Sequence, residues 1–187
     1  MRIIGGRFRG LTLAEIGKGD PAAHLRPTSD RVREAIFNLL VNGGYGDPIT
    51  GARVLDLFAG TGALGLEALS RGAAHASFVD DGKKAGALIR ANIVLTGTGG
   101  QADLMRLDAT KLGLVRGPPF DLIFLDPPYG LGFGEKALSA ALTGGWLAPG
   151  VLVVWEDNKA PMLPPPLTLV DQRRYGDTLV SLSRTPS

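Results

Sequence analysis

Residues 126–129, Asp-Pro-Pro-Tyr, follow directly after an apolar run and combine a carboxylate, a rigid turn and an aromatic ring. The two prolines lack N–H groups and have fixed φ angles, so the backbone here is stiff. The Asp126 carboxylate and the Pro127 carbonyl can accept both hydrogens of one planar NH2 group. Such bonds free the nitrogen lone pair for an electrophilic methyl group, while Tyr129 stacks on the flat base. The tetrapeptide predicts methylation of an exocyclic amine; the alternative is a proline-rich turn with a core tyrosine.

A glycine-rich segment supplies a second chemical feature. Residues 60–65 read G-T-G-A-L-G and match G-x-G-x-x-G between a predicted strand and a predicted helix, and Asp80 follows twenty residues after Gly60. Glycines such as Gly60 and Gly62 let the backbone approach a ligand closely, and a carboxylate at this spacing can bind ribose hydroxyls. The pattern favours a nucleoside-containing cofactor. A tight turn followed by a surface Asp80 is the alternative.

Two further carboxylates indicate which cofactor. Asp56 lies inside the strand before the glycines, where it would repel a diphosphate at the helix N-terminus but attract an ammonium group. Asp108 follows the third predicted strand and can meet the amine of an adenine or cap the next helix. This set suits S-adenosylmethionine better than NAD. Glu156 ends the fifth predicted strand and faces either the site or solvent.

Alternating strands and helices must position these residues. Apolar spacing and a Pro-Thr-Ser-Asp start predict a helix from about residue 28 to residue 42. Beyond residue 51 the pattern predicts parallel strands at 53–58, 76–80, 102–107, 120–126 and 151–156, with helices at 64–71, 83–95 and 134–143. Two alternating stretches at 167–173 and 178–183 predict a C-terminal hairpin.

Composition and charge set the limits. The chain has 187 residues, no cysteine and two histidines, which excludes thiol chemistry and a histidine-rich metal site. No apolar run is long enough for a membrane span or a signal peptide, so we expect no membrane contact, a cytoplasmic location and a monomer. The net charge is +2, but residues 1–33 carry +4 and the remainder −2. A basic arm therefore precedes an acidic body.

The chain resembles the class I methyltransferases of the D/N-P-P-Y type, and more closely the bacterial guanine-N2 methyltransferases of 16S ribosomal RNA. The resemblance rests on five segments that span most of the chain: MRIIGG at 1–6, LRPTSDRVREAIFN at 25–38, VLDLFAGTGALGLEA at 54–68, DPPY at 126–129 and YGDT at 175–178. It implies an α/β, Rossmann-like fold with a mostly parallel seven-stranded sheet closed by an antiparallel hairpin. Residues 1–50 would form an RNA-facing extension and residues 51–187 the cofactor-binding domain.

The resemblance also implies roles for single residues. The substrate amine would be held by Asp126 and Pro127, with Tyr129 stacked on the base. Cofactor contacts would come from Asp56, Phe58, Gly60, Gly62, Asp80 and Asp108. The RNA-facing rim would be formed by Arg7, Arg9, Arg26, Thr28, Arg31 and Arg33. The expected substrate is 16S ribosomal RNA, free or within a small-subunit assembly intermediate, and no metal is expected.

Other functions stay open at this point. The tetrapeptide also suits methylation of adenine N6 in DNA or RNA, or of a protein glutamine amide. An NAD-dependent oxidoreductase would explain the glycines and Asp80, but not Asp56 or the tetrapeptide. A non-enzymatic RNA-binding assembly factor could keep a cofactor-shaped pocket.

Overall fold

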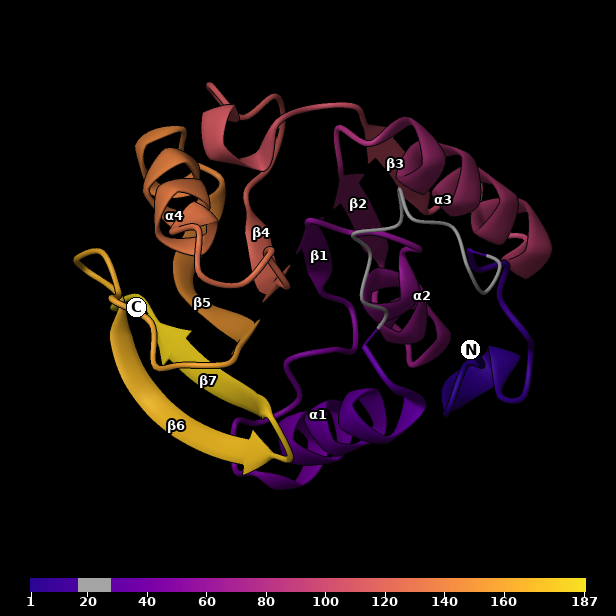
Figure 1. Cartoon of the computed structure of the whole chain (residues 1–187), viewed down its shortest axis with the longest axis horizontal. Coiled ribbons are helices and arrows are strands. Elements are labelled where there is room, and N and C mark those ends of the chain that lie inside the picture. Colours follow the sequence, from indigo (N-terminus) through magenta and orange to yellow (C-terminus); the bar gives the residue numbers. More distant parts are fainter. Residues whose placement is uncertain (17–27) are drawn as a thin grey trace.

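The fold is built on one seven-stranded sheet (Figure 1). The structure is a computed structural model that describes residues 1–16 and 28–187. The strand order is β3-β2-β1-β4-β5-β7-β6; β1 to β5 are parallel, and β7 runs antiparallel between β5 and β6. The strands are β1 Arg53–Leu57, β2 His75–Val79, β3 Ala102–Met105, β4 Phe120–Leu125, β5 Leu147–Asp157, β6 Thr168–Tyr175 and β7 Thr178–Arg184. The predicted parallel sheet with its C-terminal hairpin is confirmed.

Helices cover both faces of the sheet. On one face α1, α2 and α3 pack on side chains such as Val54 and Phe124, and on the other α4 and η2 pack on Ile123 and Val153. The helical elements are η1 Gly6–Phe8, α1 Asp30–Asn42, α2 Ala63–Ser70, α3 Lys83–Thr96, η2 Ala109–Lys111 and α4 Phe133–Thr143. None of the helices in the described ranges is both long and apolar enough to cross a membrane.

Helix α1 ends at Asn42, as the sequence predicts, and begins at Asp30, two residues after the predicted start. The Ser29 side chain accepts a hydrogen bond from the N–H of Val32, and Gly43 follows the last helical residue. The expectation that Arg33 lies on the RNA-facing rim is wrong, because Arg33 is 0% exposed. Its position, one helical turn before Phe37 and two before Leu40, places it in the buried i, i+4, i+7 stripe.

The first residues form a small antiparallel loop that joins the main core. The N–H of Ile3 donates to the Leu11 carbonyl at 2.9 Å, and the N–H of Leu13 donates to the Met1 carbonyl at 3.0 Å. The side chains of Ile3 and Leu13 are buried in the core that contains α1 and α2. The arm that the sequence predicts is therefore ordered over residues 1–16, whereas the division of the chain at residue 50 stays a prediction.

Candidate functional site

The sheet brings three carboxyl groups to one edge and one face. Phe124 of β4 pairs with Asp56 of β1 and with Val154 of β5. Because side chains alternate along a strand, Asp126 and Glu156, each two residues further on, share the face of Phe124 and Val154. All three carboxyl groups therefore lie on the α1 side at the carboxyl ends of the strands, where ligands bind in open α/β sheets.

Asp56 of β1 holds the first turn of α2 in place through a hydrogen bond. Its Oδ2 accepts the N–H of Gly65 at 2.9 Å. A Cβ at Gly65 would lie 2.4 Å from Cε1 of Phe78 and 3.2 Å from Oδ2 of Asp56, so this close approach requires glycine. Burial raises the pKa of Asp56 well above its usual range, and the charges of Asp126 and Asp80 add to this, although the Gly65 bond opposes it.

The turn between β1 and α2 has an unusual backbone. Gly60 and Gly62 have φ angles of 59° and 78°, a left-handed conformation that glycine adopts without penalty. Phe58 has φ 57° and is the one non-glycine residue with positive φ in the described ranges. That conformation costs an L-residue about 1–2 kcal/mol. Such strain concentrates at ligand sites, which agrees with the cofactor contact predicted for Phe58.

Asp80, the residue directly after β2, binds the same glycine turn. Its Oδ2 accepts the N–H of Gly60 at 2.9 Å, and its Oδ1 accepts the N–H of Gly82 at 2.8 Å. Burial raises the pKa of Asp80, and these two bonds oppose the change. Asp80 thus lies against the glycine turn, as its spacing predicts. A carboxylate oxygen has a second lone pair, so these bonds leave acceptor capacity for ribose hydroxyls.

Asp108 makes the capping contact that the sequence left as one of two alternatives. Its Oδ1 accepts the N–H of Thr110 at 2.8 Å and the hydroxyl of Thr110 at 2.7 Å. These hydrogen bonds hold the pKa of Asp108 below its usual value. A contact with an adenine amine stays a prediction for this residue.

The Asp-Pro-Pro-Tyr turn places its groups beside this edge. The N–H of Asp126 donates to the Leu57 carbonyl at 3.5 Å, which ties the turn to the end of β1. Pro127 is buried and Tyr129 is half-buried. Burial raises the pKa of Asp126 to about 7, against a hydrogen bond from Thr28 that lowers it. Burial also raises the pKa of Tyr129, whose hydrogen bond with Thr178 opposes the change.

Thr28 and Glu156 complete the acidic end of the site. The Thr28 hydroxyl lies 3.1 Å from Oδ2 of Asp126 and 3.2 Å from Oε1 of Glu156. Thr28 was expected on the RNA-facing rim; its hydroxyl instead points between two carboxyl groups. Glu156 is 3% exposed, so its side chain faces the site rather than solvent. Burial raises the pKa of Glu156, and the charge of Asp126 raises it further.

This arrangement limits what the site can bind. Asp56, Asp126 and Glu156 are acceptors whose negative charges repel one another, and burial makes each charge costly. A ligand with a positive charge or with several N–H groups relieves both costs, whereas a phosphate increases them. The glycine turn with Asp56 and Asp80 can therefore hold a nucleoside cofactor with a cationic head.

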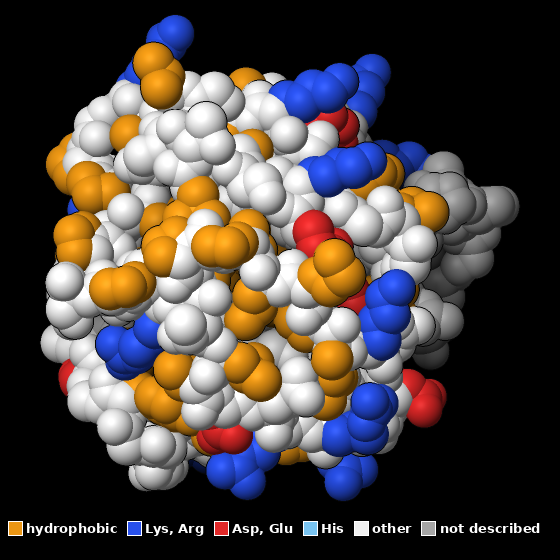
Figure 2. All heavy atoms as spheres, turned by 90° about the vertical axis from the view of Figure 1, so that its left-hand side faces the viewer, with side chains coloured by type: hydrophobic (Ala, Val, Ile, Leu, Met, Phe, Trp, Pro, Cys, Tyr) orange, Lys and Arg blue, Asp and Glu red, His pale blue; other side chains and the backbone are white. Residues whose placement is uncertain are grey.

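The residues predicted to contact RNA separate into different environments. Arg7, Arg9 and Arg31 are exposed, Arg33 is buried, and Arg26 lies outside the described residues. The Arg7 guanidinium lies over the Phe8 ring and donates to Oε1 of Gln101 at 2.6 Å. Figure 2, seen from the side of α4 and β6, shows Lys and Arg side chains gathered along its right-hand side.

Two residues to which the sequence assigned no binding role, Glu67 and Asn92, hold residues 1–16 in place. Glu67 of α2 accepts the N–H groups of Ile4 and Gly5, each at 2.8 Å. Asn92 of α3 accepts the N–H of Ala14 at 2.7 Å and donates to the Thr61 carbonyl at 2.9 Å. The one available sign was a single acid, Glu67, inside the apolar helical run at 64–69.

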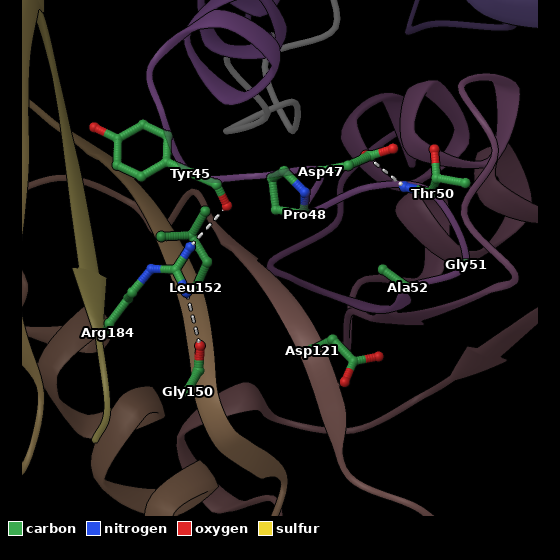
Figure 3. A pocket seen from close by; sticks show the side chains of 10 residues that line it. All are labelled: Tyr45, Asp47, Pro48, Thr50, Gly51, Ala52, Asp121, Gly150, Leu152 and Arg184. Atoms are coloured by element: carbon green, nitrogen blue, oxygen red, sulfur yellow. Dashed lines mark hydrogen bonds between the residues drawn. The ribbon is translucent and has the colours of Figure 1, made fainter. Parts of the chain in front are cut away.

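A separate hollow of about 320 Å³ lies at the opposite end of the strands. It is bordered by residues before β1, near the start of β4 and beside β5, and by Arg184 at the end of β7. The Arg184 guanidinium donates to the carbonyls of Gly150 and Tyr45 and so stabilises the wall (Figure 3). None of the predicted cofactor or substrate residues lines it.

The chain is similar to characterised and solved proteins over most of its length. The family model described as Conserved hypothetical protein 95 matches residues 1–184. Ribosomal RNA small subunit methyltransferase D of Escherichia coli (strain K12) is 37% identical over 167 residues, 88% of this chain and 79% of that protein. The putative rRNA methyltransferase YlbH of Bacillus subtilis (strain 168) is 41% identical over 146 residues, 76% and 72% of the two chains.

A solved structure supports the same grouping. The putative methyltransferase yhhF from Escherichia coli superposes with a TM-score of 0.80 at 31% identity, covering 100% of this chain and 98% of that one. This likeness confirms the class I methyltransferase fold that the resemblance implied. The chain belongs to the Conserved hypothetical protein 95 family and to the family of ribosomal RNA small subunit methyltransferase D.

Proposed function

We propose that this protein transfers a methyl group from S-adenosylmethionine to the exocyclic N2 amine of a guanine in 16S ribosomal RNA. The observation that carries the proposal is the position of Asp126 and Pro127, beside the glycine turn at the carboxyl edge of the sheet. The relatives named as small-subunit ribosomal RNA methyltransferases support the substrate class.

The cofactor site fits S-adenosylmethionine, which supplies an electrophilic methyl carbon when bound. The buried Asp56 carboxylate would pair with the ammonium group, which relieves its desolvation. Asp80 would accept hydrogen bonds from the ribose hydroxyls, and Gly60 and Gly62 let the backbone approach the ligand. Phe58 bends the chain out of β1 towards this turn, and Asp108 would lie on the adenine side.

The substrate residues act by positioning and electrostatics. The Asp126 carboxylate and the Pro127 carbonyl would each accept one hydrogen of the amine, which orients the N2 lone pair. Tyr129 would stack on the base. When N2 has gained the methyl group it carries a positive charge and loses one proton to water or to Asp126. A carboxyl group whose pKa is about 7 is matched to that task near neutral pH.

The exposed arginines would bind the phosphate backbone. Arg7, Arg9 and Arg31 belong to the +4 segment, and such contacts give affinity without reading sequence. The grooves of an RNA helix hide most base edges, so the target guanine would be in a loop or flipped out of its stack. We expect Arg26 to join this rim.

The test is to incubate the protein with labelled S-adenosylmethionine and unmodified small-subunit particles, and then to digest the RNA to nucleosides. We expect the label in N2-methylguanosine. Label in N6-methyladenosine, or in ribosomal protein, would refute the guanine assignment. Thermal-shift titration with S-adenosylhomocysteine and with NADH tests the cofactor separately, and stabilisation by NADH alone would contradict the proposal.

A further inference from the structure

Glu156 is a buried carboxyl group to which the proposed chemistry gives no task. It is 3% exposed and lies on the same face and at the same level as Asp126. Its hydrogen-bonding neighbour is the Thr28 hydroxyl, 3.2 Å from Oε1 and 3.3 Å from Oε2. Among the described residues no basic side chain forms an ion pair with it. A buried carboxyl group with so few hydrogen-bond donors around it lowers the stability of the fold unless a ligand provides a donor.

The contacts of Thr28 show that hydrogen-bond acceptors outnumber donors between Asp126 and Glu156. One hydroxyl carries one hydrogen, yet it lies within 3.3 Å of oxygens from both Asp126 and Glu156. It can donate to only one carboxyl group at a time. The other must carry a proton or stay unsatisfied. Together Asp126 and Glu156 therefore have more acceptor oxygens than nearby donors, which favours a ligand edge with at least two donors.

The substrate base offers such an edge. In guanine the N1–H and the N2 amine are adjacent donors, whereas N1 of adenine is an acceptor. We propose that Glu156 accepts the N1–H of the guanine whose N2 amine is held by Asp126, and so determines that the enzyme acts on guanine. This inference rests on the proposed function. Buried groups that hydrogen-bond a substrate N–H reject analogues that lack it.

Asp157 provides a matched comparison on the next position of β5. It is also buried, at 8% exposed. Because side chains alternate along the strand, it points to the opposite face of the sheet from Glu156. Its Oδ1 accepts the N–H of Asn158 at 2.6 Å. Removing its charge changes the field at Asp126 without changing the acceptor that would face N1.

The experiment compares two target bases in two variants. Small-subunit RNA is assembled with either guanine or 2-aminopurine at the methylated position; 2-aminopurine keeps the N2 amine but has an unprotonated N1. The wild type is expected to prefer guanine by about 10- to 100-fold in kcat/KM, the range for one unmade buried hydrogen bond. Glu156→Gln is expected to narrow this preference at least tenfold, because its carboxamide can donate to N1. Asp157→Asn should keep the wild-type ratio.

The readouts separate the ways in which the inference can fail. The intrinsic reactivities of the two amines cancel when ratios are compared between variants, and S-adenosylhomocysteine affinity reports whether each variant keeps its cofactor site. An unchanged ratio in Glu156→Gln, or an equal change in Asp157→Asn, would overturn the role of Glu156. If the wild type places no methyl group on guanine, the proposed function itself is wrong.

Discussion

Replacing Asp126 by asparagine is expected to stabilise the folded protein at pH 8 and much less at pH 5. Burial raises the pKa of Asp126 from 3.8 to about 7. One pKa unit corresponds to about 1.4 kcal/mol, so the ionised carboxylate costs the fold about 4 kcal/mol. The stabilisation gained in Asp126→Asn is smaller than this value, because the hydrogen bond from Thr28 to an asparagine oxygen is weaker than the one to the carboxylate.

The sign of the pH dependence follows from proton binding. Between pH 4 and 7 the folded state keeps a proton on Asp126 that the unfolded state has lost, so wild-type stability falls as pH rises through this range. An asparagine side chain at this position does not titrate, and the advantage of Asp126→Asn therefore grows from pH 4 to about 7. The repulsion that raises the pKa of Glu156 also disappears in this variant, which acts in the same direction.

Urea unfolding at pH 5 and pH 8 measures this difference. Asp47→Asn is the control with the opposite sign, because Asp47 accepts the N–H groups of Ile49 and Thr50 and its pKa is lowered. The Asp47 carboxyl group is ionised in the folded and the unfolded state at both pH values, so this variant should lose the same stability at pH 8 and at pH 5. If Asp126→Asn gained nothing between the two pH values, Asp126 would be ionised in the fold, and the account of a strained acidic site would be refuted.

Three further changes test the cofactor, substrate and RNA sides of the site. Asp126→Ala should abolish methyl transfer and leave S-adenosylhomocysteine affinity within about threefold of wild type by calorimetry; loss of both would make its role structural. Gly65→Ala forces a Cβ against the Phe78 ring and should cost about 1–3 kcal/mol of unfolding free energy and weaken cofactor binding; an unchanged melting temperature would contradict the geometry. Charge reversal of the exposed arginines should weaken RNA binding and flatten its dependence on salt, and identical salt slopes in filter binding would exclude the rim. These arginines are Arg7, Arg9 and Arg31.

Patterns of a few neighbouring residues predicted most of the sheet. They failed where the position of a residue depends on partners far away in the sequence. The strand that precedes Asp126 and the turn after β1 follow from hydrophobic runs and glycines, which act over a few residues. The start of β5 was expected at residue 151 but lies at Leu147. The prediction began too late because Pro149 and Gly150 interrupt the apolar pattern, at the point where the pairing of β5 with β4 is irregular. Such a bulge leaves no sign in the run itself.

The buried position of Arg33 has the same origin. An arginine in a helix is expected on the surface, since burying its charge without a partner is costly. Arg33 is compensated by Asp30 at 2.9 Å, by the Arg2 carbonyl and by Glu67 at 3.7 Å. Glu67 lies on another helix, and Arg2 lies 31 residues earlier in the chain. A periodicity argument cannot detect compensation by partners that only the fold brings together.

These partners also explain how a basic arm becomes part of an acidic site. Helix α2 begins at the glycine turn and presents Glu67 further along, where it holds the N–H groups of Ile4 and Gly5. The same Glu67 contacts Arg33, which ties α1 to α2. Thr28 lies two residues before α1, so the packing of this helix also positions the Thr28 hydroxyl within hydrogen-bond distance of Asp126. Within residues 1–16 and 28–33, the described parts of the +4 segment, the contacts of Glu67 therefore hold both the N-terminal loop and the helix that follows Thr28.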